Sequence, residues 1–130
     1  MNRIMLKSKI HRAHVTEANI NYEGSITIDE TLMEAAELVP FEQVQIYDIT
    51  NGNRLETYVI PGRRNSGEIC INGAAARKVK KGDLIIIANY VVMDEVLVRS
   101  HQPKLVYVDK LNGITRVGSG SYKALSAAVN

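Results

Sequence analysis

The chain of 130 residues contains one cysteine, Cys70, and therefore cannot form a disulfide within itself. Such sparing use of thiols suits a reducing compartment, which predicts a cytoplasmic protein. Long apolar runs are also missing, because no segment approaches the roughly 20 apolar residues that a membrane-spanning helix needs. The N-terminus lacks the basic-then-apolar pattern of a secretory signal. We therefore expect a protein that is not inserted in a membrane.

Neither sign of charge predominates, since the chain has 16 basic and 14 acidic residues and a formal net charge of +2. This balance argues against nucleic acid as a partner, and the basic run at 77–81 is typical of a solvated turn. Neither a glycine-rich phosphate loop nor a paired Cys/His zinc spacing occurs. His11 and His14 are three apart on a predicted strand and should point to opposite faces, so we expect no metal.

The size and the hydrophobic content, 45%, are those of one globular domain with its own core. Short β-rich runs separated by turn residues predominate, with one or two short helices, and this pattern predicts a mainly β barrel. The barrel domain is expected to span 1–117, followed by a flexible C-terminal tail at 118–130. The predicted strands are 3–16, 22–28, 44–49, 54–60, 69–71, 84–92 and 104–108.

Local signals locate the turns and the exposed or covered faces. Asp29 has the position of a helix N-cap before a short helix that Pro40 prevents from running on. Asn51-Gly52 predicts a hairpin between two of the strands. The run 84–92 is almost wholly apolar, as in a strand covered on both faces.

Glu23-Gly24-Ser25 is the most informative short motif, because the Ser25 hydroxyl lies close along the chain to the Gly24 carbonyl. Such a step can be a site of self-cleavage or an ordinary polar turn between strands. Glycine at position 24 would allow a close backbone approach that a Cβ would obstruct. Cys70, flanked by two isoleucines, is interpreted as a buried small hydrophobe rather than a nucleophile.

Five stretches, weak singly and strong together, occur in a characteristic order between residues 1 and 103. They are Lys9-Ile10-His11-Arg12, Tyr22-Glu23-Gly24-Ser25, Thr50-Asn51-Gly52, Thr57-Tyr58 and Asn72-Gly73-Ala74-Ala75-Ala76. In this order the chain resembles the pyruvoyl-dependent aspartate 1-decarboxylases.

The resemblance implies a six-stranded double-psi β-barrel with short helices, assembled as a homotetramer, and a zymogen that cleaves itself into 1–24 and 25–130. In that chemistry the Ser25 hydroxyl attacks the Gly24 carbonyl, the ester eliminates, and hydrolysis leaves a pyruvoyl group at position 25. The pyruvoyl ketone forms a Schiff base with L-aspartate and draws in the electrons released on decarboxylation to β-alanine, for pantothenate and coenzyme A. The resemblance thus implies neither pyridoxal phosphate nor a metal, and it allows a maturation factor as a partner.

The same resemblance implies roles for individual residues. Thr57 donates to the oxyanion during self-cleavage and contacts the substrate, and Tyr58 is the proton donor. Arg54 grips one substrate carboxylate, and Lys9 adds a point charge. The other implied substrate-binding residues are His11, Asn72, Gly73, Ala74 and Ala75. Independently of the family, strand alternation places Arg54 and Tyr58 on one face.

Two other functions stay open from the residues. A small barrel can serve as a binding module without catalysis, although such a module has no need to combine Ser25, Thr57, Tyr58 and Arg54. A self-processing hydrolase would use Ser25 as an N-terminal nucleophile. The hydrolase would keep an amine at position 25, whereas the decarboxylase would carry a ketone there.

Overall fold

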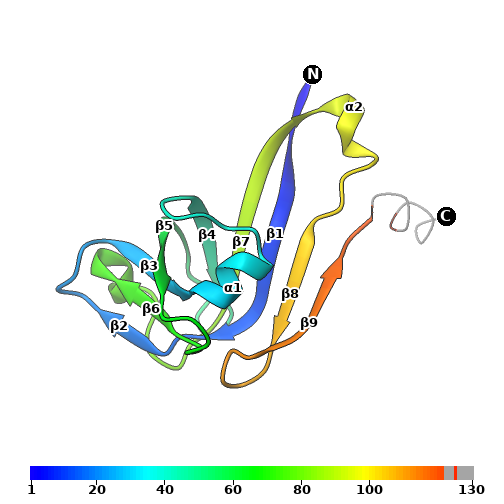
Figure 1. Cartoon of the computed structure of the whole chain (residues 1–130). Helices are drawn as coiled ribbons and strands as arrows, with labels where there is room; N and C mark the ends of the chain where they lie inside the picture. Colours follow the sequence, from blue (N-terminus) through cyan, green and yellow to red (C-terminus); the bar gives the residue numbers. More distant parts are fainter. Residues whose placement is uncertain (122–124, 126–130) are drawn as a thin grey trace.

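β-strands dominate the structure, a computed structural model that describes residues 1–121 and 125 (Figure 1). Within these residues nine strands are interrupted by three short helical segments, α1 (Glu30–Ala35), the 3-10 helix η1 (Gly73–Arg77) and α2 (Glu95–Val98). The strands are β1 (Asn2–His14), β2 (Glu17–Asn19), β3 (Ser25–Asp29), β4 (Gln43–Asp48), β5 (Arg54–Gly62), β6 (Ile69–Asn72), β7 (Leu84–Asp94), β8 (Lys104–Val108) and β9 (Ile114–Ser119). The prediction of a mainly β fold with short helices is confirmed.

The strands pair in the order β2-β6-β3-β5-β4-β7-β1-β8-β9, and in the described residues no pairing joins the two ends of this order. Segments distant in sequence pair in parallel in β1–β8, β2–β6 and β3–β5. Figure 1 shows β3, β4, β5 and β6 gathered with α1 at one end of the molecule. β1 and β7 run away from that end together, as an arm that leads to α2.

Strand alternation separates an apolar face of β3 and β6 from a polar one. The apolar face is fully buried in the core and consists of Ile26, Ile28, Ile69 and Ile71, each 0% exposed. The intervening residues lie on the opposite face because side chains alternate along a strand. These are Ser25, Thr27, Cys70 and Asn72.

The predicted helix cap and hairpin are confirmed. Asp29 caps α1 by accepting a hydrogen bond from the Thr31 N–H at 2.8 Å. Gly52 turns the β4–β5 hairpin with a φ of +80°. The second predicted strand, however, begins at Ser25 rather than at residue 22, because the residues before it form a turn that is closed by a Tyr22 N–H bond to the Asn19 carbonyl.

The prediction that the strand at 84–92 is covered on both faces is wrong for its second half. Tyr90 is 41% exposed and Val92 61% exposed, because this half of β7 lies in the arm. β2, α2 and β9 were not predicted at all. β9 runs through Ser119, two residues past the expected domain boundary, and most of the predicted tail lies outside the described residues.

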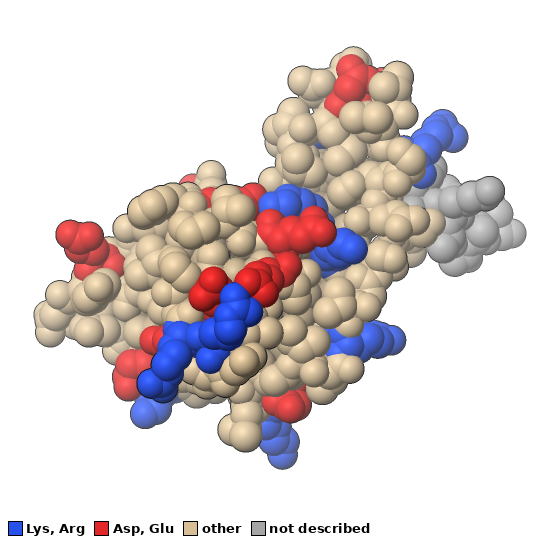
Figure 2. Space-filling model, in the orientation of Figure 1, with Lys and Arg blue, Asp and Glu red and all other residues tan. Residues whose placement is uncertain are grey.

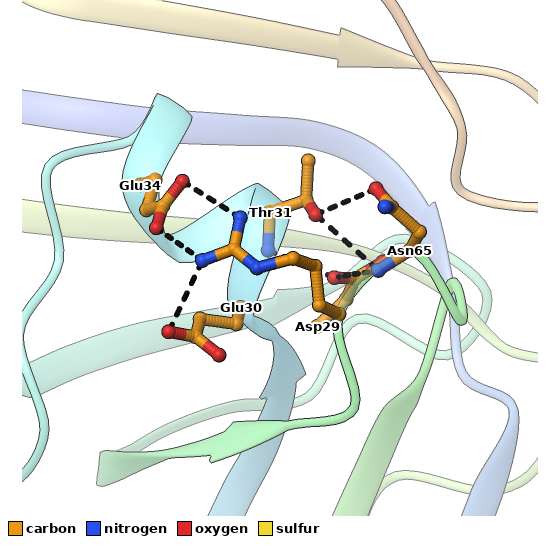
Figure 3. A network of polar contacts seen from close by, with 6 residues as sticks. Asp29, Glu30, Thr31, Glu34 and Asn65 are labelled. Atoms are coloured by element: carbon orange, nitrogen blue, oxygen red, sulfur yellow. Dashed lines mark hydrogen bonds and ion pairs between the residues drawn. The ribbon is translucent and has the colours of Figure 1, made fainter.

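Asp29 also anchors the loop that follows β5 (Figure 3). It is 3% exposed, and a buried carboxylate needs several donors. Its oxygens accept hydrogen bonds from the backbone N–H groups of Thr31, Asn65 and Gly67, at 2.8 to 3.0 Å. In the same loop, Arg64 forms ion pairs with Glu30 and Glu34 of α1. These contacts hold α1 and the loop against β3.

Asp48, at the end of β4, is a buried carboxyl group with an acidic neighbour. It is 3% exposed, and its Oδ1 accepts hydrogen bonds from the N–H groups of Thr50 and Asn51 at 2.8 and 3.2 Å. Its Oδ2 has no donor among the described residues. Burial, and then Asp83 beside it, raise the pKa of Asp48 to about 6.

This raised pKa predicts how stability changes with pH. Between about pH 4 and pH 6 the folded protein binds more protons than the unfolded chain, so stability falls as the pH rises through that window. Asparagine keeps the Oδ1 acceptor and gives Asp83 an N–H donor. We expect Asp48→Asn to raise the free energy of unfolding at pH 8 by about 1 kcal/mol, with little change at pH 4. Denaturant unfolding of both proteins across this pH range measures the effect; a variant less stable than the wild type at pH 8 would contradict it.

Candidate functional site

The Gly24–Ser25 peptide lies where the turn before β3 enters the strand. Ser25 is 1% exposed, and its Oγ accepts a hydrogen bond from Asn72 Nδ2 at 3.0 Å. The same Oγ donates to the Glu23 carbonyl oxygen at 3.3 Å. The pairing explains the first contact, because Ser25 lies opposite Asn72 in the antiparallel β3–β6 ladder. The hydroxyl next to the predicted scissile bond is therefore held by a donor and an acceptor.

Gly73, rather than Gly24, is the glycine that this packing requires. Gly73 has a φ of +75°, and a Cβ there would lie 2.7 Å from both Gly24 Cα and Gly24 N, and 2.9 Å from the Tyr22 carbonyl oxygen. A Cβ on Gly24 would meet nothing within 4 Å. The expected steric reason for glycine at position 24 is therefore wrong. The backbones do approach closely, and Gly73 makes the room.

Two further side chains contact Asn72. Its Nδ2 also donates to Thr27 Oγ1 at 3.0 Å, and its Oδ1 accepts from Cys70 Sγ at 3.2 Å. Sequence reasoning missed Thr27, and its interpretation of Cys70 as a core hydrophobe is wrong because Cys70 lies on the polar face of β6. The signal that would have found both is the β3–β6 register, in which Thr27 lies opposite Cys70.

β5 flanks β3 on its other side and carries Thr57 and Tyr58. Ile26 lies opposite Val59 in the parallel β3–β5 pair, so the preceding residues, Ser25 and Tyr58, adjoin each other. The half-buried Tyr58 has its ring centroid 6.1 Å from that of Phe41. Thr57 faces the other side of β5 by strand alternation, and none of residues 1–121 forms a hydrogen bond with its hydroxyl.

Arg54 lies four residues before Tyr58, about 13 Å farther along β5. Its guanidinium carbon is 4.0 Å from the centroid of the Tyr47 ring, and Tyr47 Oη is 2.8 Å from Tyr90 Oη. That hydrogen bond, and then burial, raise the pKa of Tyr90 to about 12. Both tyrosines line a cavity of about 420 Å³ between β4, β7 and β1.

Lys9 lies on β1, where it pairs with Ala88, a residue that lines this cavity. Within the described part of the chain neither Lys9 nor Arg54 forms an ion pair with a carboxylate. Neither charge is therefore neutralised by a carboxylate of the described residues. We call Lys9 and Arg54 the cationic group.

His11 lies two residues beyond Lys9 on β1, and the prediction that His11 and His14 face opposite sides is wrong. A bulge between Ile10 and Ala13, with Arg12 at a φ of 59°, breaks the alternation of β1. Both histidines therefore line one cavity of about 330 Å³. Burial, and then the charges of Lys9 and Arg12, lower the pKa of His11, which favours its neutral form.

The predicted site residues thus do not form one cluster within a single chain. Gly24, Ser25, Asn72 and Gly73 come together and are called the cleavage group, with Tyr58 beside Ser25. Ala74 and Ala75 continue from it into η1, whose first N–H groups have no carbonyl of the same helix to bind. In residues 1–121 and 125, three or more His, Cys, Asp or Glu side chains do not gather as metal ligands.

The surface shows no concentration of one charge on the face drawn in Figure 2, where basic and acidic side chains are intermixed. The upper part of that face, over the β1–β7 arm, is mostly uncharged. None of the helices in the described residues has the length and apolar content to cross a membrane.

Comparisons with known proteins now identify the family. The family model described as aspartate decarboxylase matches residues 1–115. The aspartate 1-decarboxylase of Syntrophus aciditrophicus is 62% identical over 114 residues, which cover 88% of this chain and 98% of the relative. That of Dehalococcoides mccartyi strain 195 is 60% identical over 116 residues, 89% of this chain and 94% of the relative. The chain belongs to the aspartate decarboxylase family.

Among solved structures, the chain is similar to a computationally designed protein, msDPBB_sym2, with a TM-score of 0.40 and 19% identity. The likeness covers 67% of this chain and 96% of the designed one. It is too distant to support a conclusion.

The contact between Gly73 and Gly24 predicts opposite effects of alanine at the two positions. In a Ser25→Ala background, which removes the nucleophile, Gly73→Ala should lower the free energy of unfolding by about 1–3 kcal/mol, because a left-handed φ and a backbone clash are both strained. The matched control, Gly24→Ala, should change it by less than about 0.5 kcal/mol. Thermal unfolding of the three proteins measures this. Equal losses in the two variants would show that the close approach is not made by Gly73.

Proposed function

We propose that this chain cleaves itself between Gly24 and Ser25 and then acts on L-aspartate with a pyruvoyl group derived from Ser25. Decarboxylation of aspartate to β-alanine, in pantothenate biosynthesis, is the activity of its family. Family membership favours this activity over a binding module or an N-terminal nucleophile hydrolase. The observation that carries the proposal for this chain is the buried Ser25 hydroxyl, held 3.0 Å from Asn72 Nδ2 beside Gly24.

Maturation begins when Ser25 Oγ attacks the Gly24 carbonyl carbon and the peptide nitrogen leaves as the Ser25 amine. The resulting ester breaks at the Ser25 Cβ–Oγ bond, which frees a carboxylate on Gly24 and leaves a dehydroalanine at position 25. One water molecule then replaces the nitrogen, which departs as ammonia, and the products are chains 1–24 and 25–130. In this proposal Thr57 donates a hydrogen bond to the oxyanion formed by the first attack.

The residues around Ser25 fit a pyruvoyl group at that position. Asn72 offers an N–H donor, and Gly73 has no side chain to occupy the space next to residue 24. The pyruvoyl group supplies an electron-withdrawing ketone that accepts the electron pair left when CO2 departs. Tyr58, adjoining position 25 on β5, then returns a proton to the substrate carbon.

Substrate binding follows from the charges. L-aspartate has two carboxylates, and the cationic group offers two cations without ion-pair partners in the described residues. Arg54 can bind one carboxylate with two hydrogen bonds, and Lys9 adds a point charge. Asn72 and the N–H groups of Gly73, Ala74 and Ala75 are proposed to hold the end of the substrate that reacts. Neutral His11 is proposed as a supporting hydrogen-bonding group.

The distance between the cleavage group and the cationic group favours a homo-oligomer. The backbones of Arg54 and Tyr58 are about 13 Å apart along one strand, and Lys9 lies three strands from Arg54 in the order β5-β4-β7-β1, so these residues are spread over one chain. The arm and α2 also expose large apolar side chains, with Ile4 74%, Val92 61% and Val96 82% exposed. We propose a homotetramer in which the cationic group of one chain completes the site of another. A cytoplasmic location and a maturation factor are proposed from the family resemblance.

Ser25→Ala tests the self-cleavage. Alanine has no Oγ to attack Gly24, so this variant should stay one chain and form no β-alanine from L-aspartate. Mass spectrometry of the denatured protein and an assay of CO2 release measure the two outcomes. Ser119→Ala, which changes another serine that follows glycine, should mature and react as the wild type does. Cleavage of the 24–25 bond in Ser25→Ala would remove Ser25 from the mechanism.

Tyr58→Phe separates maturation from turnover. Phenylalanine keeps the ring beside Phe41 and removes the proton donor, so the variant should cleave normally and lose about 10²–10⁴-fold in turnover. CO2 release per cleaved chain is the measurement. Turnover equal to that of the wild type would mean that another group supplies the proton.

A further inference from the structure

We propose that Cys70 is a positioning residue for self-cleavage, acting through the side-chain amide of Asn72. The inference rests on the proposed function, because it concerns the reaction that separates 1–24 from 25–130. Cys70 does not touch the scissile bond. Its thiol contacts the residue that contacts Ser25 Oγ.

Both ends of the Asn72 amide are held. Nδ2 donates to Ser25 Oγ and to Thr27 Oγ1, each at 3.0 Å, and Oδ1 accepts from Cys70 Sγ at 3.2 Å. Asn72 is itself only 3% exposed. These contacts use both amide protons and the carbonyl oxygen, so they specify which end of the amide faces Ser25.

The thiol is a contact that distinguishes the two orientations of the amide. The Thr27 hydroxyl can donate as well as accept, so it could pair with an amide rotated by 180°. The Ser25 hydroxyl donates its proton to the Glu23 carbonyl at 3.3 Å, and a rotated amide would have to displace that bond. Rotation would instead turn the N–H groups toward sulfur, which is a weak acceptor, and would deprive the thiol of Oδ1. Cys70 therefore favours the orientation in which Nδ2 faces Ser25.

The thiol remains a donor at neutral pH. Burial, and then the carboxylates of Glu68 and Glu17, raise the pKa of Cys70 above the usual thiol range. A thiolate in its place would be an acceptor and would favour the rotated amide. The environment of Cys70 thus maintains the protonated form that Asn72 Oδ1 needs.

The orientation matters most when the ester eliminates. The Ser25 Cα proton passes to a base, water in the simplest case, the Cβ–Oγ bond breaks, and its electron pair goes to Oγ, which becomes an oxygen of the Gly24 carboxylate. An N–H donor 3.0 Å from Oγ stabilises the negative charge that develops there. An amide oxygen at the same place would repel that charge. Loss of the thiol should therefore slow elimination more than the initial attack.

The test compares Cys70→Ala with the conservative variant Cys70→Ser, starting from uncleaved precursor isolated in the cold. Cys70→Ala should cleave about tenfold more slowly, as expected for one lost hydrogen bond in the reacting state, and should accumulate an ester that hydroxylamine splits after Gly24. Cys70→Ser keeps a donor and should cleave within about twofold of the wild-type rate. The double variant Cys70→Ala/Asn72→Ala should cleave no more slowly than Asn72→Ala, because Cys70 acts only through Asn72.

Ile71→Val is the control for a structural effect, because it changes the core face of the same strand. It should lower the unfolding temperature without ester accumulation. If Cys70→Ala does not fold, Cys70→Val takes its place, because valine fills the space of the thiol on a strand without offering a donor, and it should accumulate ester in the same way. Four results would each overturn the inference alone. These are wild-type cleavage by Cys70→Ala, equal slowing by Cys70→Ser, slowing without ester, and wild-type cleavage by a folded Cys70→Val. A wild-type chain that never cleaves at this bond would overturn the proposed function itself.

Discussion

The antiparallel register between β3 and β6 is the constraint on which the site depends. It places Ser25 opposite Asn72 and Thr27 opposite Cys70, and it carries the chain directly into Gly73, which packs against Gly24. The register is specified by the core on the other face, where four isoleucines are completely buried. A slip of one residue would move those isoleucines out of the core, so apolar burial holds the polar face in place.

The side chains of the polar face satisfy one another's hydrogen-bonding groups. Each hydrogen-bonding atom of the Asn72 amide has a partner, and the Ser25 hydroxyl has both a donor and an acceptor. Buried polar networks that are fully satisfied are rigid and fix the orientation of their members. Elsewhere Lys9 and Arg54 lack carboxylate partners in the described residues. The chain thus separates a hydrogen-bonded region around Ser25 from a charged region at Lys9 and Arg54. The proposed function assigns self-cleavage to the first and substrate binding to the second.

Features that depend on neighbours in sequence could be predicted, and those that depend on pairing across the sheet could not. The Asp29 cap and the Asn51-Gly52 hairpin are local, and both are confirmed. The bulge at Arg12 shifts the alternation of β1, so strand period alone misplaced His11 and His14. The sequence assigned the steric need for glycine to Gly24, whereas the structure assigns it to Gly73. This could not be predicted, because only the folded chain brings position 73 against residue 24. Family resemblance supplied most site residues, whereas Cys70 and Thr27 needed the β3–β6 register.

The most direct test of the central claim is the mass of the chain that begins at position 25, measured under denaturing conditions with and without a carbonyl-reactive label. The account predicts a chain 25–130 that lacks a free amine, has the mass of a pyruvoyl terminus and takes up one label. A chain 25–130 with a free serine amine and no label would contradict the claim and favour a hydrolase with an N-terminal nucleophile. A protein that stays whole after prolonged warm incubation would contradict self-cleavage.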